Sequence, residues 1–392
     1  MSVRTGLDVW SVIDFRPLRG RRVGAIVNPT SIDHRFRHLA DLLSAAEGVQ
    51  LVCLFGPEHG VRGEAQYMEA VGQAVDARTR VPVHSLYGTS FASLRPKREW
   101  LADLDVVVFD VQDVGARYYT YLATMALAME DCARAGIAFV VLDRPNPLGG
   151  ELVEGNHVAP GFRSFVGLYD VPARHGMTAG ELARLLDAEQ GWGTDLTVVA
   201  CQGLTRAMRW ADTGLHFVPP SPNMPTPDTA LVYPGMCLLE GTNLSEGRGT
   251  CRPFEQFGAP WLDADALAGR LAMMGLPGLA LRPASFTPTF DKHRGVSCGG
   301  AFLHVTAPAA FRPVRTGLAA VMAARELAPG DFAWRTEGYE FVTNRPAFDL
   351  LAGTDAGRTA VEAGASFADT VHLLDDAAEA FLERRQPYLV YA

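Results

Sequence analysis

The first 200 residues alternate between short apolar segments and segments with helical periodicity, and this alternation is the strongest constraint on the fold. Short β-branched runs without polar alternation are typical of strands buried on both faces of a sheet. Thr178 and Glu181 form a capping box that predicts the start of one of the intervening helices. Strand and helix in repetition predict a parallel, doubly wound α/β sheet with right-handed crossovers. We expect its strands at residues 22–28, 49–55, 81–86, 105–111, 137–142 and 196–200.

The sequence pattern changes after residue 200. Residues 218–260 are dense in Pro, Gly, Asn and Thr, and loops of that length inside compact domains are often functional. The chain is therefore predicted to form a parallel-sheet domain at residues 1–205 and a smaller, loop-rich α+β auxiliary domain at residues 206–392. In the second domain we expect helices at 263–274, 314–327 and 367–385, and strands near 279–281 and 301–306.

Charge and motif content exclude several classes of protein. The 35 Lys and Arg residues against 44 Asp and Glu residues give a formal charge of −9, and no basic run occurs, so no nucleic-acid partner is expected. Neither of the two lysines lies in a P-loop, and no G-x-G-x-x-G follows the first strand. A G-x-S-x-G nucleophile elbow is also missing from the sequence. We therefore expect no nucleotide cofactor, and no cofactor of another kind is indicated.

The cellular compartment is predicted from apolar segments and cysteines. No run of apolar residues has the length of a signal peptide or a membrane span, which predicts a cytoplasmic protein without a membrane partner. The six cysteines lie far apart without C-x-x-C spacing, as expected of buried thiols in a reducing compartment.

Polar side chains follow several of the predicted strands. In an open parallel sheet a ligand binds outside the carboxyl ends of the strands, so these side chains predict a site on one rim. Glu58 is the strongest candidate for a general acid, because Gly-Pro before it and His-Gly after it hold it in a tight turn. Any one of the others could instead be a helix cap or a structural ion pair. The candidate ligand-binding residues of this rim are His59, Asp110, Gln112, Asp113 and Arg117.

The long loop of the second half supplies a second group of candidates. A solvated linker would not normally need so many turns fixed by Pro and Gly, so we expect a ligand-binding loop. Lys292, later in the chain, is a further binding candidate, although a surface ion pair is the simpler explanation for it alone. The loop candidates are Asn223, Glu240, Asn243, Glu246 and Arg248.

Five segments together resemble the DUF1343 family, whose characterised members are exo-β-N-acetylmuramidases of glycoside hydrolase family 171. The resemblance extends from about residue 23 to residue 391. It implies a Rossmann-like domain and an auxiliary domain with the active cleft between them. It also implies removal of β-1,4-linked N-acetylmuramic acid (MurNAc) from non-reducing ends of peptidoglycan fragments, such as a muropeptide or MurNAc-GlcNAc. The segments are residues 56–60, 109–121, 142–147, 221–226 and 240–250.

Glycoside hydrolysis requires two carboxyl groups, one protonated and one charged. Glu58 is our candidate for the acid. For the second carboxylate, Glu240 or Glu246 is preferred over Asp110 or Asp113, because a group across the cleft reaches the other side of the sugar. The acetamide of the substrate is an alternative nucleophile, which a protein carboxylate would then orient.

Muramic acid also carries a lactyl carboxylate, which calls for a cation, and Arg117 and Arg248 are the candidates. Two other classes of function stay open at this point. One is a non-catalytic sugar-binding module. The other is a metal-dependent hydrolase that uses His59, Asp110 and His175, although no metal-ligand spacing is present in the sequence.

Overall fold

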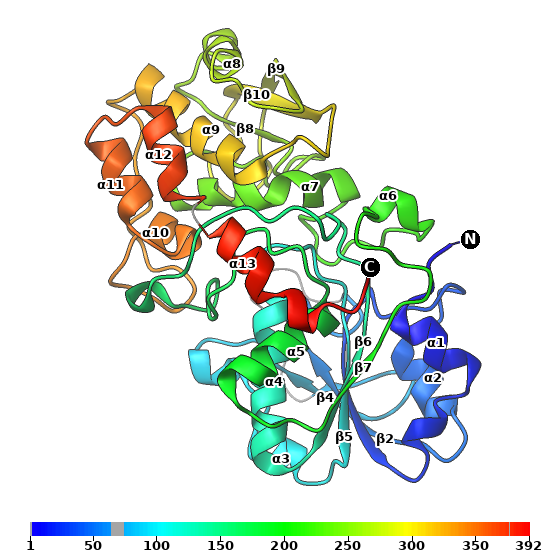
Figure 1. Ribbon diagram of the computed structural model, residues 1–392. Coiled ribbons are helices and arrows are strands. Elements are labelled where there is room, and N and C mark those ends of the chain that lie inside the picture. Colours follow the sequence, from blue (N-terminus) through cyan, green and yellow to red (C-terminus); the bar gives the residue numbers. More distant parts are fainter. Residues whose placement is uncertain (1, 64–73, 376) are drawn as a thin grey trace.

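The computed structural model describes residues 2–63, 74–375 and 377–392 (Figure 1). Its first half is built on a seven-stranded sheet with the order β3-β4-β2-β1-β5-β6-β7. Every pairing is parallel except that of β3 with β4. The sheet contains all six predicted strands and one more, the short β3, which was not predicted from the sequence. The strands are β1 (Arg22–Val27), β2 (Gln50–Gly56), β3 (Ala74–Val75), β4 (Pro82–Ser85), β5 (Val106–Asp110), β6 (Ala138–Leu142) and β7 (Leu196–Val199).

The order of the parallel strands confirms the predicted doubly wound fold. Numbered along the chain, the six parallel strands lie in the order 3-2-1-4-5-6, which is the order of the Rossmann fold. The winding reverses between β1 and β5, so the carboxyl ends of these two strands define the usual ligand crevice of such a sheet.

Helices cover both faces of this sheet, and alternate strand residues pack against each face. Val23, Ala25 and Val27 of β1 pack in one core cluster with residues of α1 (Gly6–Val12) and α2 (Leu39–Ala45). Ile26 points to the opposite face, where α4 (Tyr121–Ala135) and α5 (Ala179–Gln190) lie with the short α3 (Arg98–Leu101) (Figure 1). α5 begins at the predicted capping box. This alternation is the pleat of a strand buried on both sides.

The second half has a smaller antiparallel sheet with the order β8-β10-β9. The predicted helices near 263–274 and 314–327 are confirmed as α8 and α9. The strand predicted near 279–281 lies within the longer β9, and the one predicted near 301–306 overlaps β10, which begins earlier and ends at Val305. The stretch predicted as a loop also contains α7, which begins at Pro227 after the Thr226 N-cap. The elements are α6 (Trp210–Thr213), α7 (Pro227–Met236), β8 (Gln256–Ala259), α8 (Ala264–Ala272), β9 (Leu279–Phe286), β10 (Cys298–Val305) and α9 (Pro313–Leu327).

The prediction of one helix over 367–385 is wrong. Two helices, α12 (Phe367–Leu373) and α13 (Ala378–Arg384), follow α10 (Ala347–Ala352) and α11 (Ala356–Glu362). α13 returns to the parallel-sheet domain and lies beside α5 (Figure 1), where Arg384 binds Glu189 at 2.5 Å. The division near residue 205 therefore stays a prediction, because the end of the chain packs on the first domain. None of the described helices combines the length and apolarity needed to cross a bilayer.

Candidate active site

A cavity of roughly 740 Å³ lies between the end of β2 and the loops of the second half of the chain. Its walls combine segments that are far apart in the sequence, so the site exists only in the folded chain. Eight of the predicted site residues line it: Glu58, His59, Asn223, Glu240, Asn243, Glu246, Arg248 and Lys292. Most of the wall is formed by residues 58–59, 118–121, 221–224, 240–248, 291–293 and 333–343.

Glu58 lies two residues after the end of β2, in a sharp turn. His59 has a φ of 72°, a left-handed conformation that non-glycine residues rarely adopt, and Gly60 continues it with a φ of 78°. The side chain of Glu58 is 19% exposed, and its Oε2 accepts a hydrogen bond from Thr120 Oγ1 at 3.1 Å. Tyr121 Oη donates to the backbone carbonyl of Pro220 at 2.6 Å and lies 3.3 Å from the backbone carbonyl oxygen of Glu58. These contacts hold the carboxyl group at the cavity wall.

Burial raises the pKa of the Glu58 carboxyl. The hydrogen bond from Thr120 and the positive charge of Arg248 oppose this shift, and the negative charge of Glu240 adds to it. The net shift is upward, so Glu58 keeps its proton to a higher pH than an ordinary glutamate, which suits a proton donor.

Glu240 and Glu246 lie on the facing loop, where one arginine joins them. Arg248 Nη2 is 2.6 Å from Glu240 Oε1, and its Nε is 3.0 Å from Glu246 Oε1. Lys292 Nζ lies 3.0 Å from the other carboxylate oxygen of Glu246. Two carboxylates and two cations therefore form one continuous, nearly buried network.

The glycines on both sides of Arg248 are required by close backbone approach. Gly247 and Gly249 have φ values of 77° and 76°. A Cβ at Gly247 would lie 2.5 Å from the carbonyl oxygen of Gln256, and one at Gly249 would lie 2.7 Å from the amide nitrogen of Phe290. This tight loop fixes where the guanidinium can reach.

The ion pair reverses the effect of burial on Glu240. Burial alone would raise the pKa of this carboxyl, but the charge and hydrogen bond of Arg248, together with a hydrogen bond from Tyr339 and the charge of Lys292, outweigh it. Tyr339 Oη also donates to Glu240 Oε2 at 2.8 Å, and the pKa of Glu240 is lowered overall. The cavity thus holds one glutamate biased toward the acid and one biased toward the carboxylate, the division expected of an acid and its charged partner.

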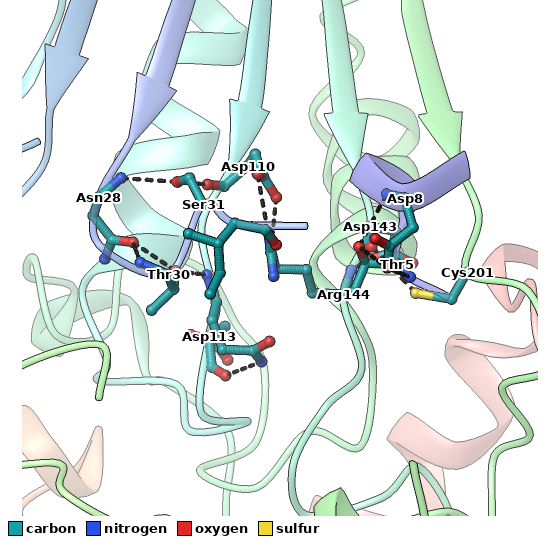
Figure 2. Close-up of polar contacts among 12 residues, drawn as sticks. Thr5, Asp8, Asn28, Thr30, Ser31, Asp110, Asp113, Asp143, Arg144 and Cys201 are labelled. Atoms are coloured by element: carbon teal, nitrogen blue, oxygen red, sulfur yellow. Dashed lines mark hydrogen bonds and ion pairs between the residues drawn. The ribbon is translucent and has the colours of Figure 1, made fainter. Parts of the chain in front are cut away.

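Four predicted residues do not line the cavity, and for them the prediction of substrate contact is corrected. Asp110 is fully buried and pairs with Arg144 through contacts of 2.5 and 3.0 Å (Figure 2). Gln112 donates from Nε2 to the carbonyl oxygens of Asp113 and Pro145. The Asp113 carboxylate accepts from the backbone N–H of Gly115, and burial raises its pKa to about 7.

Arg117, the fourth of these residues, is also structural. Its Nη atoms donate to the backbone carbonyls of Asn156, Val171 and Leu351 at 2.8 to 2.9 Å. Burial lowers its pKa to about 10. All its Nη contacts go to the protein backbone, so Arg117 is excluded as the cation for a lactyl carboxylate.

The usual crevice between β1 and β5 is filled by the protein's own polar side chains (Figure 2). Ser31 donates to the carbonyl of Asp110, and Thr30 accepts from the backbone N–H of Gln112 at 2.9 Å. Arg144 covers Asp110 from the end of β6. Among the strand ends, that of β2 therefore provides the catalytic candidate.

The metal-dependent alternative is not supported by the positions of its residues. His59 lines the cavity, Asp110 is paired with Arg144, and His175 is fully buried, which lowers its pKa to about 3. Within the described parts of the chain, no group of three or more His, Cys, Asp or Glu side chains is placed to hold a metal ion.

Sequence reasoning missed the wall formed by residues 333–343. This segment connects α9 and α10, and its length without helix or strand was an available signal. Glu340 and Phe341 have φ values of 44° and 68°, so the backbone is strained where it borders the cavity. Burial raises the pKa of Glu340 to about 8, and the nearby charges of Glu58 and Glu240 add to the shift.

Four packed aromatic side chains line the cavity and form an aromatic floor, for which the sequence predicted no role: Tyr119, Tyr121, Tyr233 and Phe254. Tyr119 packs edge-on against Tyr121 and Tyr233, with ring centroids 5.0 and 5.6 Å apart. Tyr233 in turn contacts Phe254 at 4.9 Å. Such a floor gives a sugar ring an apolar surface beside the charged groups.

Comparisons with known proteins agree with this architecture. Over 389 residues, 99% of this chain and 91% of the relative, the chain is 45% identical to the peptidoglycan β-N-acetylmuramidase NamZ of Bacillus subtilis (strain 168). Two crystal structures of DUF1343 family proteins from Bacteroides fragilis NCTC 9343 superpose with TM-scores of 0.90 and 0.77, at 34% and 30% identity. Each comparison covers 100% of this chain and 99% of the other.

Matches to models of protein families identify the family of this chain. Residues 23–228 match the model of the exo-β-N-acetylmuramidase NamZ amino-terminal domain, and residues 231–391 match that of its carboxy-terminal domain. The two matches meet in the first turn of α7 and together span almost the whole sequence. The chain therefore belongs to the NamZ family of exo-β-N-acetylmuramidases.

Proposed function

We propose that this exo-β-N-acetylmuramidase uses Glu58 as its general acid and Glu240 as its charged carboxylate. The bond cleaved joins MurNAc at a non-reducing end to the next sugar of a peptidoglycan fragment. The observation that carries these roles is the opposite pKa shift of two glutamates in one cavity. A module that only binds sugar has no need of such a division.

In the proposed reaction, the bond between C1 of MurNAc and the bridging oxygen breaks. The proton of Glu58 moves to that oxygen, so the leaving sugar departs as a neutral alcohol. Water supplies the hydroxyl group that C1 acquires, and its remaining proton restores the protonated glutamate by the end of the cycle. Glu240 supplies the negative charge opposite the acid, acting on C1, on the water or on the acetamide that attacks C1.

Glu240 is preferred over Glu246 because of the number of cations that each one binds. Glu246 contacts both Arg248 and Lys292, and its side chain is only 2% exposed. Glu240 shares one cation and is 12% exposed toward the cavity. Glu240 is therefore paired with fewer cations than Glu246 and is more accessible to a substrate.

We propose MurNAc-GlcNAc and muropeptides as the substrates. The test is to incubate the purified protein with MurNAc-GlcNAc, with and without a chelator, and to quantify released MurNAc. We expect release that the chelator leaves unchanged. Binding of the disaccharide without release would indicate a sugar-binding module. Activity lost with chelator and restored by zinc would indicate a metal-dependent hydrolase.

We also propose a cytoplasmic site of action. All six cysteines are free thiols and five of them are buried, which suits a reducing compartment. Fractionation of the source cells with detection of the native protein tests this location, and recovery in the extracellular fraction would contradict it.

A further inference from the structure

Among the described residues, the cavity wall carries three Lys or Arg side chains: Arg248, Lys292 and Arg335. The first two are already engaged by the protein. Arg248 binds Glu240 and Glu246, as described above. Lys292 Nζ lies 2.9 to 3.0 Å from the carbonyl oxygens of Leu239 and Leu244 and from Glu246 Oε2. The positive charges of Arg248 and Lys292 are therefore already balanced by the two carboxylates of the protein.

Arg335 differs from both. In the part of the chain that the structure describes, no carboxylate lies within ion-pair distance of its partly exposed guanidinium. Its carbon Cζ stands 5.1 Å from the centroid of the Tyr339 ring, a cation–π contact. Its backbone N–H donates to the carbonyl of Gly241 at 2.9 Å, which ties this wall to the residue after Glu240.

Tyr339 joins the arginine to the reacting group. Its ring lies below the Arg335 guanidinium, and its hydroxyl donates to Glu240 Oε2. The cation and the catalytic carboxylate are therefore held by two parts of one side chain. In MurNAc the anomeric carbon is C1 and the lactyl ether is on C3 of the same ring. A sugar whose C1 faces Glu240 can thus direct its lactyl group toward Arg335.

We propose that Arg335 binds the lactyl carboxylate of MurNAc and so determines the specificity of the enzyme, an inference that rests on the function proposed above. A guanidinium offers two parallel N–H groups to a carboxylate, which a lysine cannot. Arg335 takes the role that the sequence assigned to Arg117 or Arg248. A sugar without the lactyl group leaves the cation unpaired in the complex, which weakens its binding in the transition state.

The test uses two chromogenic β-N-acetylmuramides that differ in one group. One carries the lactyl carboxylate and the other its neutral primary amide. We expect the wild-type enzyme to prefer the acid by roughly 10- to 100-fold in kcat/KM, as for a charge-assisted hydrogen-bonded pair. The Arg335→Gln variant should lose this advantage in kcat/KM on the acid substrate, and its kcat/KM on the amide substrate should change little. Arg335→Lys should recover part of the preference.

A matched control is Arg345→Gln. Arg345 also lies over an aromatic ring, 4.1 Å from the centroid of Phe162, but it does not line the cavity. The Arg345→Gln variant should keep the wild-type kcat/KM on both substrates. Equal losses on acid and amide in Arg335→Gln, or no preference in the wild type, would overturn the role of Arg335. If the wild type cleaves neither substrate, the proposed function fails instead. Calorimetric binding of free MurNAc and its amide to the wild type and to Arg335→Gln then decides the role of Arg335 separately.

Discussion

Arg248 Nη2 lies 2.6 Å from Glu240 Oε1, and this contact determines which of two glutamates carries the negative charge. Arg248 lowers the pKa of both Glu58 and Glu240, but only Glu240 accepts a hydrogen bond from it. Glu58 is left with burial as the dominant effect and keeps its proton more readily. Arg248 thus favours the charged form of Glu240 and leaves Glu58 as the candidate proton donor.

Replacement of Glu58 by Gln tests the acid directly. The amide preserves the shape of the side chain and removes its transferable proton. We expect turnover of MurNAc-GlcNAc to fall by ~100-fold or more. An aryl leaving group needs less protonation, so the loss should be smaller on a 4-nitrophenyl substrate. The measurement is kcat on both substrates, with Glu99→Gln at an exposed position as the control. Near-normal turnover of the disaccharide would move the acid elsewhere, first to Glu240.

Arg248→Lys tests the bridge between the two loop glutamates. A lysine ammonium is a point charge and cannot contact Glu240 and Glu246 with the forked geometry of a guanidinium. We expect kcat to fall by roughly 10-fold or more and the acid limb of its pH profile to move upward, because the pKa of Glu240 rises. The loss should be equal on the acid and amide substrates defined above. A loss confined to the acid substrate would make Arg248 the lactyl-binding cation after all.

The sequence predicted the parallel sheet well because buried parallel strands leave a strong local signature. Val106, Val107 and Val108 of β5 have no polar alternation, and each face of the sheet takes alternate residues. Glu58 was predictable for a similar reason, since its turn is encoded by its immediate neighbours. Both signals are local in the chain.

The errors at the rim come from long-range contacts. Asp110 and Arg144 are 34 residues apart, and their pairing, which removes Asp110 from the site, is not visible in either segment alone. Arg335 and Tyr339 reach the cavity only because the loop after α9 folds back on Gly241. Such residues have no local pattern that distinguishes a cavity wall from an exposed loop.

The ionisation of Glu340 should lower the activity at alkaline pH. Its carboxyl has a pKa of about 8, so it is neutral at pH 7 and becomes charged above pH 8. The new charge competes with the lactyl carboxylate for Arg335. We expect this ionisation alone to lower kcat/KM on the MurNAc substrate about 10-fold between pH 7 and pH 9.

Glu340→Gln stays neutral and should lose this limb, so that any remaining decline reports the deprotonation of Glu58. The measurement is kcat/KM from pH 6 to pH 9.5 for both proteins, with Glu326→Gln at an exposed position as the control. Identical alkaline limbs in the wild type and Glu340→Gln would show that Glu340 does not titrate in this range.

Glu154 provides a prediction about stability, away from the cavity. It is 1% exposed, and its Oε1 accepts from the backbone N–H of Arg315 at 2.8 Å. Its Oε2 has no hydrogen-bond partner among the described residues, and burial raises its pKa from 4.5 to about 8. The folded protein therefore holds this proton over a pH range in which the unfolded chain has released it.

A carboxyl that binds its proton more tightly in the folded state lowers the free energy of unfolding as pH rises between the two pKa values. The penalty is negligible below pH 4.5, grows between pH 4.5 and 8, and reaches up to about 3 kcal/mol at pH 7. Glu154→Gln keeps the neutral shape and removes the penalty. Its stability relative to the wild type should therefore increase steadily from pH 5 to pH 8. Urea unfolding at pH 5, 6, 7 and 8 measures the difference, with the exposed Glu151→Gln as the control. A difference that does not change with pH would show that Glu154 is ionised in the folded protein.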